Sequence, residues 1–153
     1  MTNRCTRLSL PLREAILRGA AFKVDEFVRH YPATMAAPLA VYSQGVEVPP
    51  GARTVFVAGQ VSMDADGRTL EDCAAEADLA FGNVVKVLAD AGLAATDIVK
   101  LNTYMTRPDD VAALREVRTR HFGDHAPAST LLFVAGLAAP IWHIEIEAVA
   151  AKA

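Results

Sequence analysis

The last extended run of this 153-residue chain holds the side chains best suited to acid–base chemistry. Glu145 alternates with His143 and Glu147, so these polar side chains share one face of the expected strand. The opposite face carries the apolar side chains Trp142, Ile144 and Ile146. A carboxylate beside such an apolar surface can act as a general base that activates water. It can equally be structural, accepting hydrogen bonds or pairing with a lysine across the sheet.

Three further segments carry side chains that can bind a polar ligand. Ser129 and Thr130 stand at the start of an expected strand, where their hydroxyls can bind a substrate or merely cap backbone groups. Tyr42 can orient a ligand through its phenol, or simply pack with its hydroxyl at the surface. Asn102 lies in the middle of an expected strand, where its amide either bonds to neighbouring backbone or faces a cleft.

The composition narrows the class of protein. Hydrophobic residues make up 52% and charged residues 22% of the chain, which is typical of one globular domain. The formal net charge of −3, without a cluster of Lys and Arg, argues against nucleic acid as the main partner, since such binding depends on phosphate neutralisation. No apolar run approaches the roughly 20 residues that a membrane span needs, and the first residues do not form a secretory leader. We therefore expect a cytoplasmic protein that does not associate with membranes.

We expect neither a metal site nor a disulfide. Cys5 and Cys73 are too few and too far apart, and the four histidines show no metal-ligand spacing. Cys73 falls on the apolar face of an expected helix and is interpreted as a small core residue. No Gly-x-Ser-x-Gly segment presents a nucleophile for Ser-His-Asp chemistry.

The elements that position these residues begin with two short extended runs. Residues 41–48 and 53–58 flank Pro49-Pro50-Gly51 and predict a β-hairpin. The second run is apolar on both faces, so we expect its strand to be buried.

Helices and strands then alternate. A helix is predicted over residues 71–91, where apolar positions recur at helical spacing before Gly92, and another over residues 109–122. Further strands are predicted over residues 98–106, 130–135 and 143–150. The order β-β-α-β-α-β-β predicts a single α+β domain in which two helices cover one face of a mixed sheet.

The other face of this sheet has no element to cover it. The strands carry apolar side chains on both faces, such as Phe56, Leu132, Ile144 and Ile146. Large exposed apolar sheet faces are rare on monomers. Self-association through the bare face is the simplest resolution.

The N-terminal residues stand apart from this pattern. We expect residues 1–26 to form an extension and residues 27–153 to form the main domain. Apolar positions from Leu12 to Val28 recur at helical spacing, so the extension is expected to be partly helical. The alternative is a start codon assigned too early, with the protein beginning near Val24 or Val28.

Five short segments, in order along the chain, resemble the Rid (YjgF-like, "endoribonuclease L-PSP") family of reactive-intermediate deaminases across about residues 27–153. Each segment occurs widely by chance, but their order and the elements between them make the resemblance specific. The segments are Tyr42-Ser43-Gln44-Gly45, Val57-Ala58-Gly59-Gln60, Gly92 with Asp97-Ile98-Val99-Lys100, Pro127-Ala128-Ser129-Thr130 and Ile144-Glu145-Ile146-Glu147-Ala148.

This resemblance implies a chorismate-mutase-like α+β fold and a homotrimer in which three sheets close a central barrel. It implies small-molecule clefts between subunits, hydrolysis of an enamine or imine acid to a 2-keto acid and ammonia, and no cofactor. Glu145 matches the glutamate that positions water or shuttles a proton, and is the implied catalytic residue. Tyr42 matches the tyrosine that lines the same cleft, and the full set of candidate substrate-binding residues is Tyr42, Ser129, Thr130, Gly59, Gln60 and Asn102.

One position departs from the family pattern. Ser129 stands where the deaminases carry an arginine that holds the substrate carboxylate, and a hydroxyl cannot replace the paired charge-assisted bonds of a guanidinium. The leading hypothesis is therefore a deaminase of a small enamine or imine that is not efficient on 2-aminoacrylate. The alternative is a non-catalytic trimer that binds a small metabolite. A ribonuclease or translation inhibitor fits the acidic balance least well.

Overall fold

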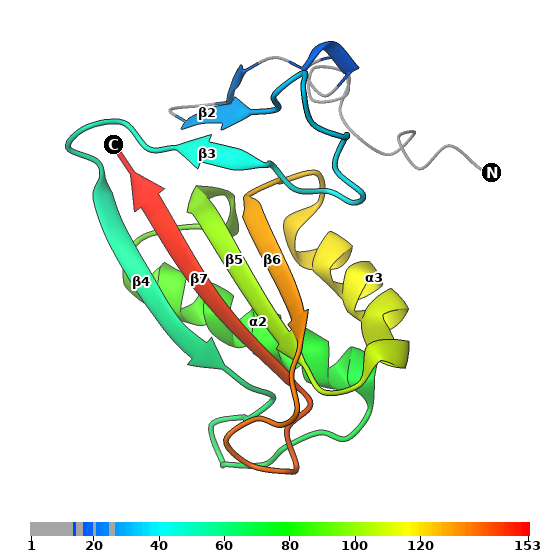
Figure 1. Ribbon diagram of the computed structural model, residues 1–153. Coiled ribbons are helices and arrows are strands. Elements are labelled where there is room, and N and C mark those ends of the chain that lie inside the picture. Colours follow the sequence, from blue (N-terminus) through cyan, green and yellow to red (C-terminus); the bar gives the residue numbers. More distant parts are fainter. Residues whose placement is uncertain (1–13, 15–16, 20, 25–26) are drawn as a thin grey trace.

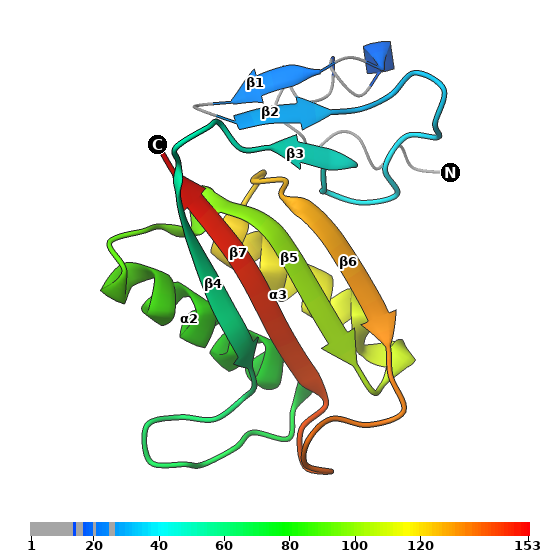
Figure 2. The same ribbon diagram turned by 60° about the vertical axis from the view of Figure 1, so that its left-hand side comes forward.

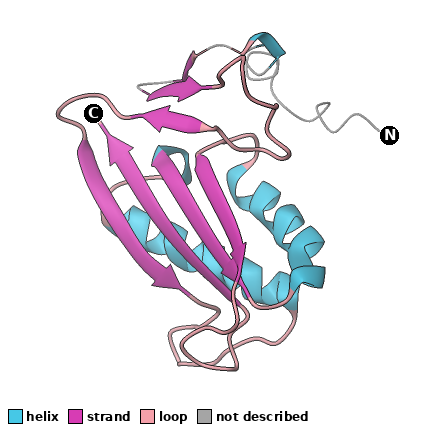
Figure 3. Ribbon diagram, viewed as in Figure 1, coloured by secondary structure: helices cyan, strands magenta, loops and turns pink. Residues whose placement is uncertain are grey.

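A four-stranded mixed sheet with two long helices on one face forms the body of the molecule, and a three-stranded sheet lies across one end (Figures 1 and 2). The computed structural model describes residues 14, 17–19, 21–24 and 27–153. Figure 3 shows the predicted α+β architecture, in which both long helices lie on the same face of the large sheet. Within these described ranges, no helix has the length and apolar character needed to cross a membrane.

The large sheet has the strand order β4-β7-β5-β6. Its strands are β4 (Arg53–Gln60), β5 (Ile98–Met105), β6 (Ala128–Phe133) and β7 (Ile144–Lys152). Strands β5 and β6 are parallel, whereas β7 is antiparallel to both β4 and β5. Parallel neighbours require a crossover, and helix α3 (Val111–Phe122) supplies it.

Helix α2 (Cys73–Asp90) has strong local signals at both ends. The Asp72 carboxylate accepts a hydrogen bond from the Ala75 backbone N–H at 3.0 Å and so caps the first turn. At the other end Gly92 has a φ of 71°, and the Leu93 backbone N–H donates to the Leu88 carbonyl at 2.8 Å. This is a Schellman ending, for which glycine is the favoured residue.

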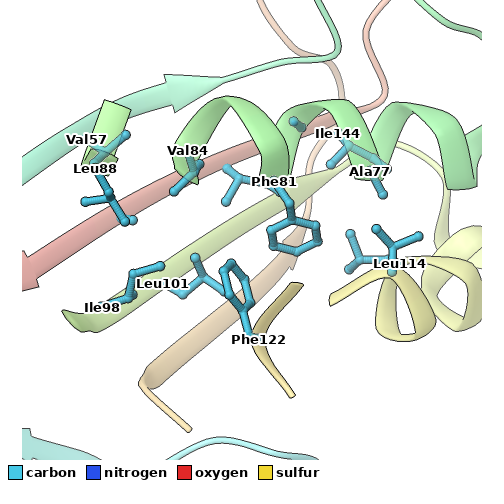
Figure 4. Packing of buried hydrophobic residues seen from close by; sticks show 14 of the residues in the cluster. Val57, Ala77, Phe81, Val84, Leu88, Ile98, Leu101, Leu114, Phe122 and Ile144 are labelled. Carbon is cyan, nitrogen blue, oxygen red and sulfur yellow. The ribbon is translucent and has the colours of Figure 1, made fainter. Parts of the chain in front are cut away.

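The core lies between the helices and the large sheet, as Figure 4 shows. The rings of Phe81 of α2 and Phe122 of α3 pack edge to face, with their centroids 5.1 Å apart. This contact packs the two helices against each other above the sheet. Cys73 is buried in the same cluster, as the sequence predicted. The rest of the apolar stripe of α2 is fully buried: Ala77, Ala80, Phe81, Val84 and Leu88.

The small sheet was not predicted. Strand β3 (Gly45–Glu47) pairs with β2 (Phe27–His30), which pairs in turn with β1 (Phe22–Val24). The predicted hairpin between residues 41–48 and 53–58 is therefore wrong, because β3 and β4 belong to different sheets. Pro49 and Pro50 lie between them, and proline has no backbone N–H with which to continue a ladder.

The segment over residues 12–28, expected to be partly helical, is described in part, and its residues 14, 17 and 18 are helical. Its described C-terminal part is extended rather than helical, since it forms β1 and the start of β2. Phe27 packs with Val99 and Ala151 in a small second core under the small sheet. In this part of the chain, hydrogen bonding and packing between neighbouring strands favour the extended structure more than the helical spacing of a few apolar residues favours a helix.

The prediction that residues 53–58 form a buried strand is wrong for the single chain. Strand β4 is at the edge of the sheet, and only one of its faces meets the helices. Val57 on that face is 4% exposed, whereas Phe56 on the other face is 78% exposed. Leu132 of β6 is 49% exposed on the same bare face, where the sequence had indicated uncovered apolar side chains.

Candidate functional site

Glu145 lies on the bare face of the large sheet, at an irregularity between β4 and β7. The β4 register shifts between Val57 and Gln60, which is a β-bulge. The bulge places Gly59 against Glu145, and a Cβ atom at position 59 would overlap the Glu145 carboxylate. Among the residues that the structure describes, none forms a hydrogen bond or ion pair with the Glu145 side chain. Its carboxylate is therefore available to a ligand or a water molecule.

Glu147, two residues further along the same face, is held by its neighbours. Its Oε2 accepts hydrogen bonds from Tyr104 Oη at 2.9 Å and from Asn102 Nδ2 at 3.3 Å. The hydrogen bond to Glu147 raises the pKa of Tyr104, because the bond is lost when the phenol ionises. Asn102 thus contacts a structural carboxylate on the bare face. A shallow hollow of about 330 Å³ lies over these residues, between Phe56 and Lys100.

Ser129 and Thr130 point to opposite faces of the sheet, as successive residues of a strand must. Thr130 is on the bare face, where its Oγ1 accepts a hydrogen bond from Lys100 Nζ at 2.6 Å. Ser129 is on the helix side and lines a much larger cavity. The two hydroxyls therefore do not belong to one binding surface within a chain.

The larger cavity has a volume of about 680 Å³ and lies between β6, α3 and residues 38–42. Tyr42 and Ser129 both line it, so the structure brings these two candidates together. Thr103 of β5 contributes a third hydroxyl beside Ser129. This space is called the α3 cleft below. Its lining is completed by Pro38, Leu39, Ala40, Val41, Ala112, Leu114, Arg115, Arg118, Thr119 and Leu131.

A buried serine next to Tyr42 fixes the cleft wall. The Ser43 backbone N–H donates to the Pro127 carbonyl at 3.0 Å, and Ser43 Oγ donates to the Ala126 carbonyl at 2.6 Å. Tyr31 Oη contacts Ser43 Oγ at 2.8 Å. Ser43 is 1% exposed. Sequence reasoning missed this anchor, because only the fold brings residue 43 beside the segment before β6.

Arginines reach the α3 cleft from the helix. Arg115 and Arg118 both line the cleft, whereas Arg107 and Arg120 do not. Arg107 contacts His143 and the Glu71 carbonyl, and Arg120 pairs with Asp78. Arg115 was missed, although its position one turn before Arg118 was a signal for a shared helix face.

Gln60 is used within its own strand. Its Nε2 approaches the carbonyls of Ala58 and Gly59 at 3.2 and 3.3 Å. Gln60 thus supports the bulge that positions Glu145. The described residues include no group of three His, Cys, Asp or Glu side chains placed to hold a metal ion.

The chain matches the family model described as Endoribonuclease L-PSP over residues 33–152. It is 33% identical over 131 residues to the human 2-iminobutanoate/2-iminopropanoate deaminase, covering 83% of this chain and 93% of that protein. It is 32% identical over 117 residues to a RutC family protein of Pyrococcus abyssi, covering 75% of this chain and 89% of that protein. The protein therefore belongs to the Rid/YjgF/L-PSP family.

Solved structures agree with this assignment. A Rid-family protein of unknown function from Yersinia pestis superposes with a TM-score of 0.75 at 31% identity, covering 84% of this chain and all of that one. Escherichia coli TdcF with bound serine superposes with a TM-score of 0.63 at 32% identity, covering 78% of this chain and 91% of that one. The resemblance inferred from five short segments is thus confirmed at the level of the family and the fold.

Proposed function

We propose that this protein is a hydrolytic deaminase of a small imine or enamine and that Glu145 is its catalytic residue. The observation that supports the proposal is a difference in hydrogen bonding between two glutamates on the same face of β7. Glu147 is held by Tyr104 and Asn102, whereas Glu145 faces Gly59 with no hydrogen-bond partner among the described residues. The deaminase names of the relatives support the same chemistry.

The reaction needs one water molecule and one group that carries a proton. The water oxygen bonds to the imine carbon while the Glu145 carboxylate accepts a proton and passes it to the nitrogen. The hydroxyl proton of the resulting carbinolamine is then transferred to the nitrogen, the C–N bond breaks, and ammonia leaves a carbonyl behind. An enamine enters the same route after its terminal carbon gains a proton and its nitrogen loses one.

The complete site requires more than one chain in this proposal. Glu145 lies on the bare face, and Tyr42 and Ser129 lie on the helix side of the same sheet. A homotrimer in which the bare faces meet would cover Phe56 and Leu132, which are 78% and 49% exposed in the single chain. It would also allow Glu145 of one subunit to meet the α3 cleft of its neighbour.

In this proposal the preferred substrate is not 2-aminoacrylate, the smallest enamine acid. Ser129 has no charge with which to hold a carboxylate at the start of β6, and loss of such a bond costs on the order of 2 kcal/mol. We therefore expect poor turnover of 2-aminoacrylate compared with other imines. The same serine favours a second candidate, a trimer that binds a small metabolite in the α3 cleft without turning it over.

An imine-deamination assay separates the two candidates. An amino-acid oxidase generates a panel of imines in the assay, and a serine dehydratase supplies 2-aminoacrylate, each in the presence of a trapping reagent that competes for the imine. A deaminase diverts the imine from the trap and releases the keto acid faster. No acceleration on any member of the panel, together with ligand-dependent melting shifts, would favour the binding protein.

A further inference from the structure

Two arginines of helix α3 face the cleft that contains Ser129. Arg115 and Arg118 are three residues apart, so they lie on one face of the helix, and both line the cleft. Two like charges one turn apart repel each other and slightly destabilise a helix.

Neither arginine has a carboxylate partner among the residues that the structure describes. Arg118 Nη2 donates to the His125 carbonyl at 3.2 Å, and the guanidinium lies 5.9 Å from the centre of the Phe122 ring. Burial lowers the pKa of Arg118 to about 10, so this side chain stays charged at neutral pH in a desolvated position. A partly buried cation without a counter-ion is costly. Arg120 on the same helix forms an ion pair with Asp78 instead.

The rest of the cleft fits an acid with an apolar body. Four hydroxyl side chains line it, those of Tyr42, Thr103, Thr119 and Ser129. Between them lie the aliphatic side chains of Leu39, Val41, Leu114 and Leu131. In the single chain, before a neighbouring subunit covers part of it, the cleft has a volume of about 680 Å³, which leaves room for a side chain longer than a methyl group.

We propose that Arg118, assisted by Arg115, binds the carboxylate of the ligand, so that α3 supplies the charge that Ser129 of β6 lacks. The ligand class that follows is a 2-imino acid, or its 2-oxo acid product, with an extended aliphatic side chain that fills the space beside Leu114 and Leu131. This inference rests on the proposed function in taking the α3 cleft as the substrate site. It makes Arg118 and Arg115 specificity-determining residues.

Calorimetric titration of the purified full chain tests the inference without requiring turnover. The probes are 4-methyl-2-oxopentanoate, pyruvate, which has the same head but a single methyl group, and 4-methyl-2-pentanone, which has no carboxylate. We expect the first to bind at least ten-fold more tightly than either of the others. Arg118→Gln and Arg115→Gln should each weaken it about ten-fold or more, since each removes a charge-assisted bond. Arg118→Lys should restore part of the loss.

Arg120→Gln is the matched control, because it removes a charge from the same helix outside the cleft and should leave the affinity unchanged. Arg115 is exposed, so its replacement tests the inference even if Arg118→Gln impairs folding. Equal affinity for the acid and the ketone, no binding of 4-methyl-2-oxopentanoate at millimolar concentration, or no effect of either arginine would overturn it. Binding that depends on arginine without turnover of any imine would retain this inference and refute the deaminase.

Discussion

The carboxylate of Glu145 occupies the space that a side chain at position 59 would need, directly against the backbone of Gly59. Glycine is used here for close approach, and the β-bulge in β4 brings that backbone to the carboxylate. The relationship joins two of the five segments that indicated the family. It also explains why they belong together: one segment supplies the carboxylate and the other the surface on which it rests.

Gly59→Ala tests this relationship. The added methyl group must displace the Glu145 carboxylate, so we expect deamination to fall at least ten-fold, which corresponds to about 1.4 kcal/mol in the activation barrier. The melting temperature should change little, because Gly59 is not in the main core. Gly67→Ala is a useful comparison, since a Cβ there meets nothing within 4 Å, although its φ of 78° carries a strain of its own. Normal activity in Gly59→Ala would show that the position of the carboxylate is not critical.

The proposed trimer depends on the bare sheet face. Phe56→Glu places a charge on that face, on the edge strand β4, and we expect light scattering to report a monomer for this variant and the proposed trimer for the unmodified protein. The fold of the single chain should survive, because this side chain is already 78% exposed. Val87→Glu, on the outer side of α2, is the control that should stay trimeric. A Phe56→Glu protein that remains trimeric would place the interface elsewhere.

Glu76 of α2 makes stability depend on pH. It is fully buried, and neither carboxylate oxygen forms a well-aligned hydrogen bond with the described residues, although the His143 backbone N–H is close enough to favour the charged form. Burial raises the pKa of Glu76 from 4.5 to about 7, although the Arg107 guanidinium offsets this in part. Between these values the folded protein holds a proton that the unfolded chain has released, so the free energy of unfolding falls as the pH rises from 4.5 to 7.

Glu76→Gln should remove this dependence. The neutral amide has nearly the same shape, so we expect the free energy of unfolding at pH 8 to increase by about 2 kcal/mol. Urea denaturation at several pH values measures the effect, and the gain should vanish near pH 4. A variant that is less stable than the unmodified protein at pH 8 would mean that the carboxylate has a stabilising partner.

His125 acts in the opposite direction. Its Nε2 donates to the Ile98 carbonyl at 2.7 Å, and its Nδ1 lies 3.4 Å from Arg29 Nη2. Burial lowers the pKa of His125 from 6.5 to about 4, so the unfolded chain takes up a proton first as the pH falls. This contribution to stability is present above pH 6.5 and is lost between 6.5 and 4.

Replacing His125 with Gln should therefore flatten the loss of stability below pH 6.5. The same denaturation series checks this, with His30→Gln as the control, since His30 is on the surface beside Glu47. A slope that His125→Gln leaves unchanged would assign the acid sensitivity to other groups.

The sequence predicted correctly those elements that have clear capping residues at their ends or a regular spacing of apolar side chains. Asp72 and Gly92 bound α2, and the alternation along residues 144–150 fixes which side chains of β7 face the helices. The interruption at Pro49 and Pro50 was misinterpreted as a turn within a hairpin, because partner choice between strands depends on contacts far away in sequence. Strands β1 and β2 were not predicted for the same reason.

The candidate site was predictable only in part. Ser129 and Thr130 were grouped as substrate-binding residues, but the period of two along a strand puts them on opposite faces, and the structure places them so. That Arg118 lines the same cleft as Ser129 could not be predicted, because it depends on where α3 lies relative to β6. The missing charge at Ser129 of β6 can be related to the charge of Arg118 on α3 only once the positions of both elements are known.

The most direct test of the account compares Glu145→Gln with Glu147→Gln in the imine-deamination assay. Glu145→Gln keeps the shape of the side chain but cannot accept the water proton, so we expect turnover to fall at least a hundred-fold with an unchanged melting temperature. Glu147→Gln should retain most of the activity, because Glu147 is engaged by Tyr104 and Asn102. Full activity in Glu145→Gln would contradict the account and remove this carboxylate from the mechanism.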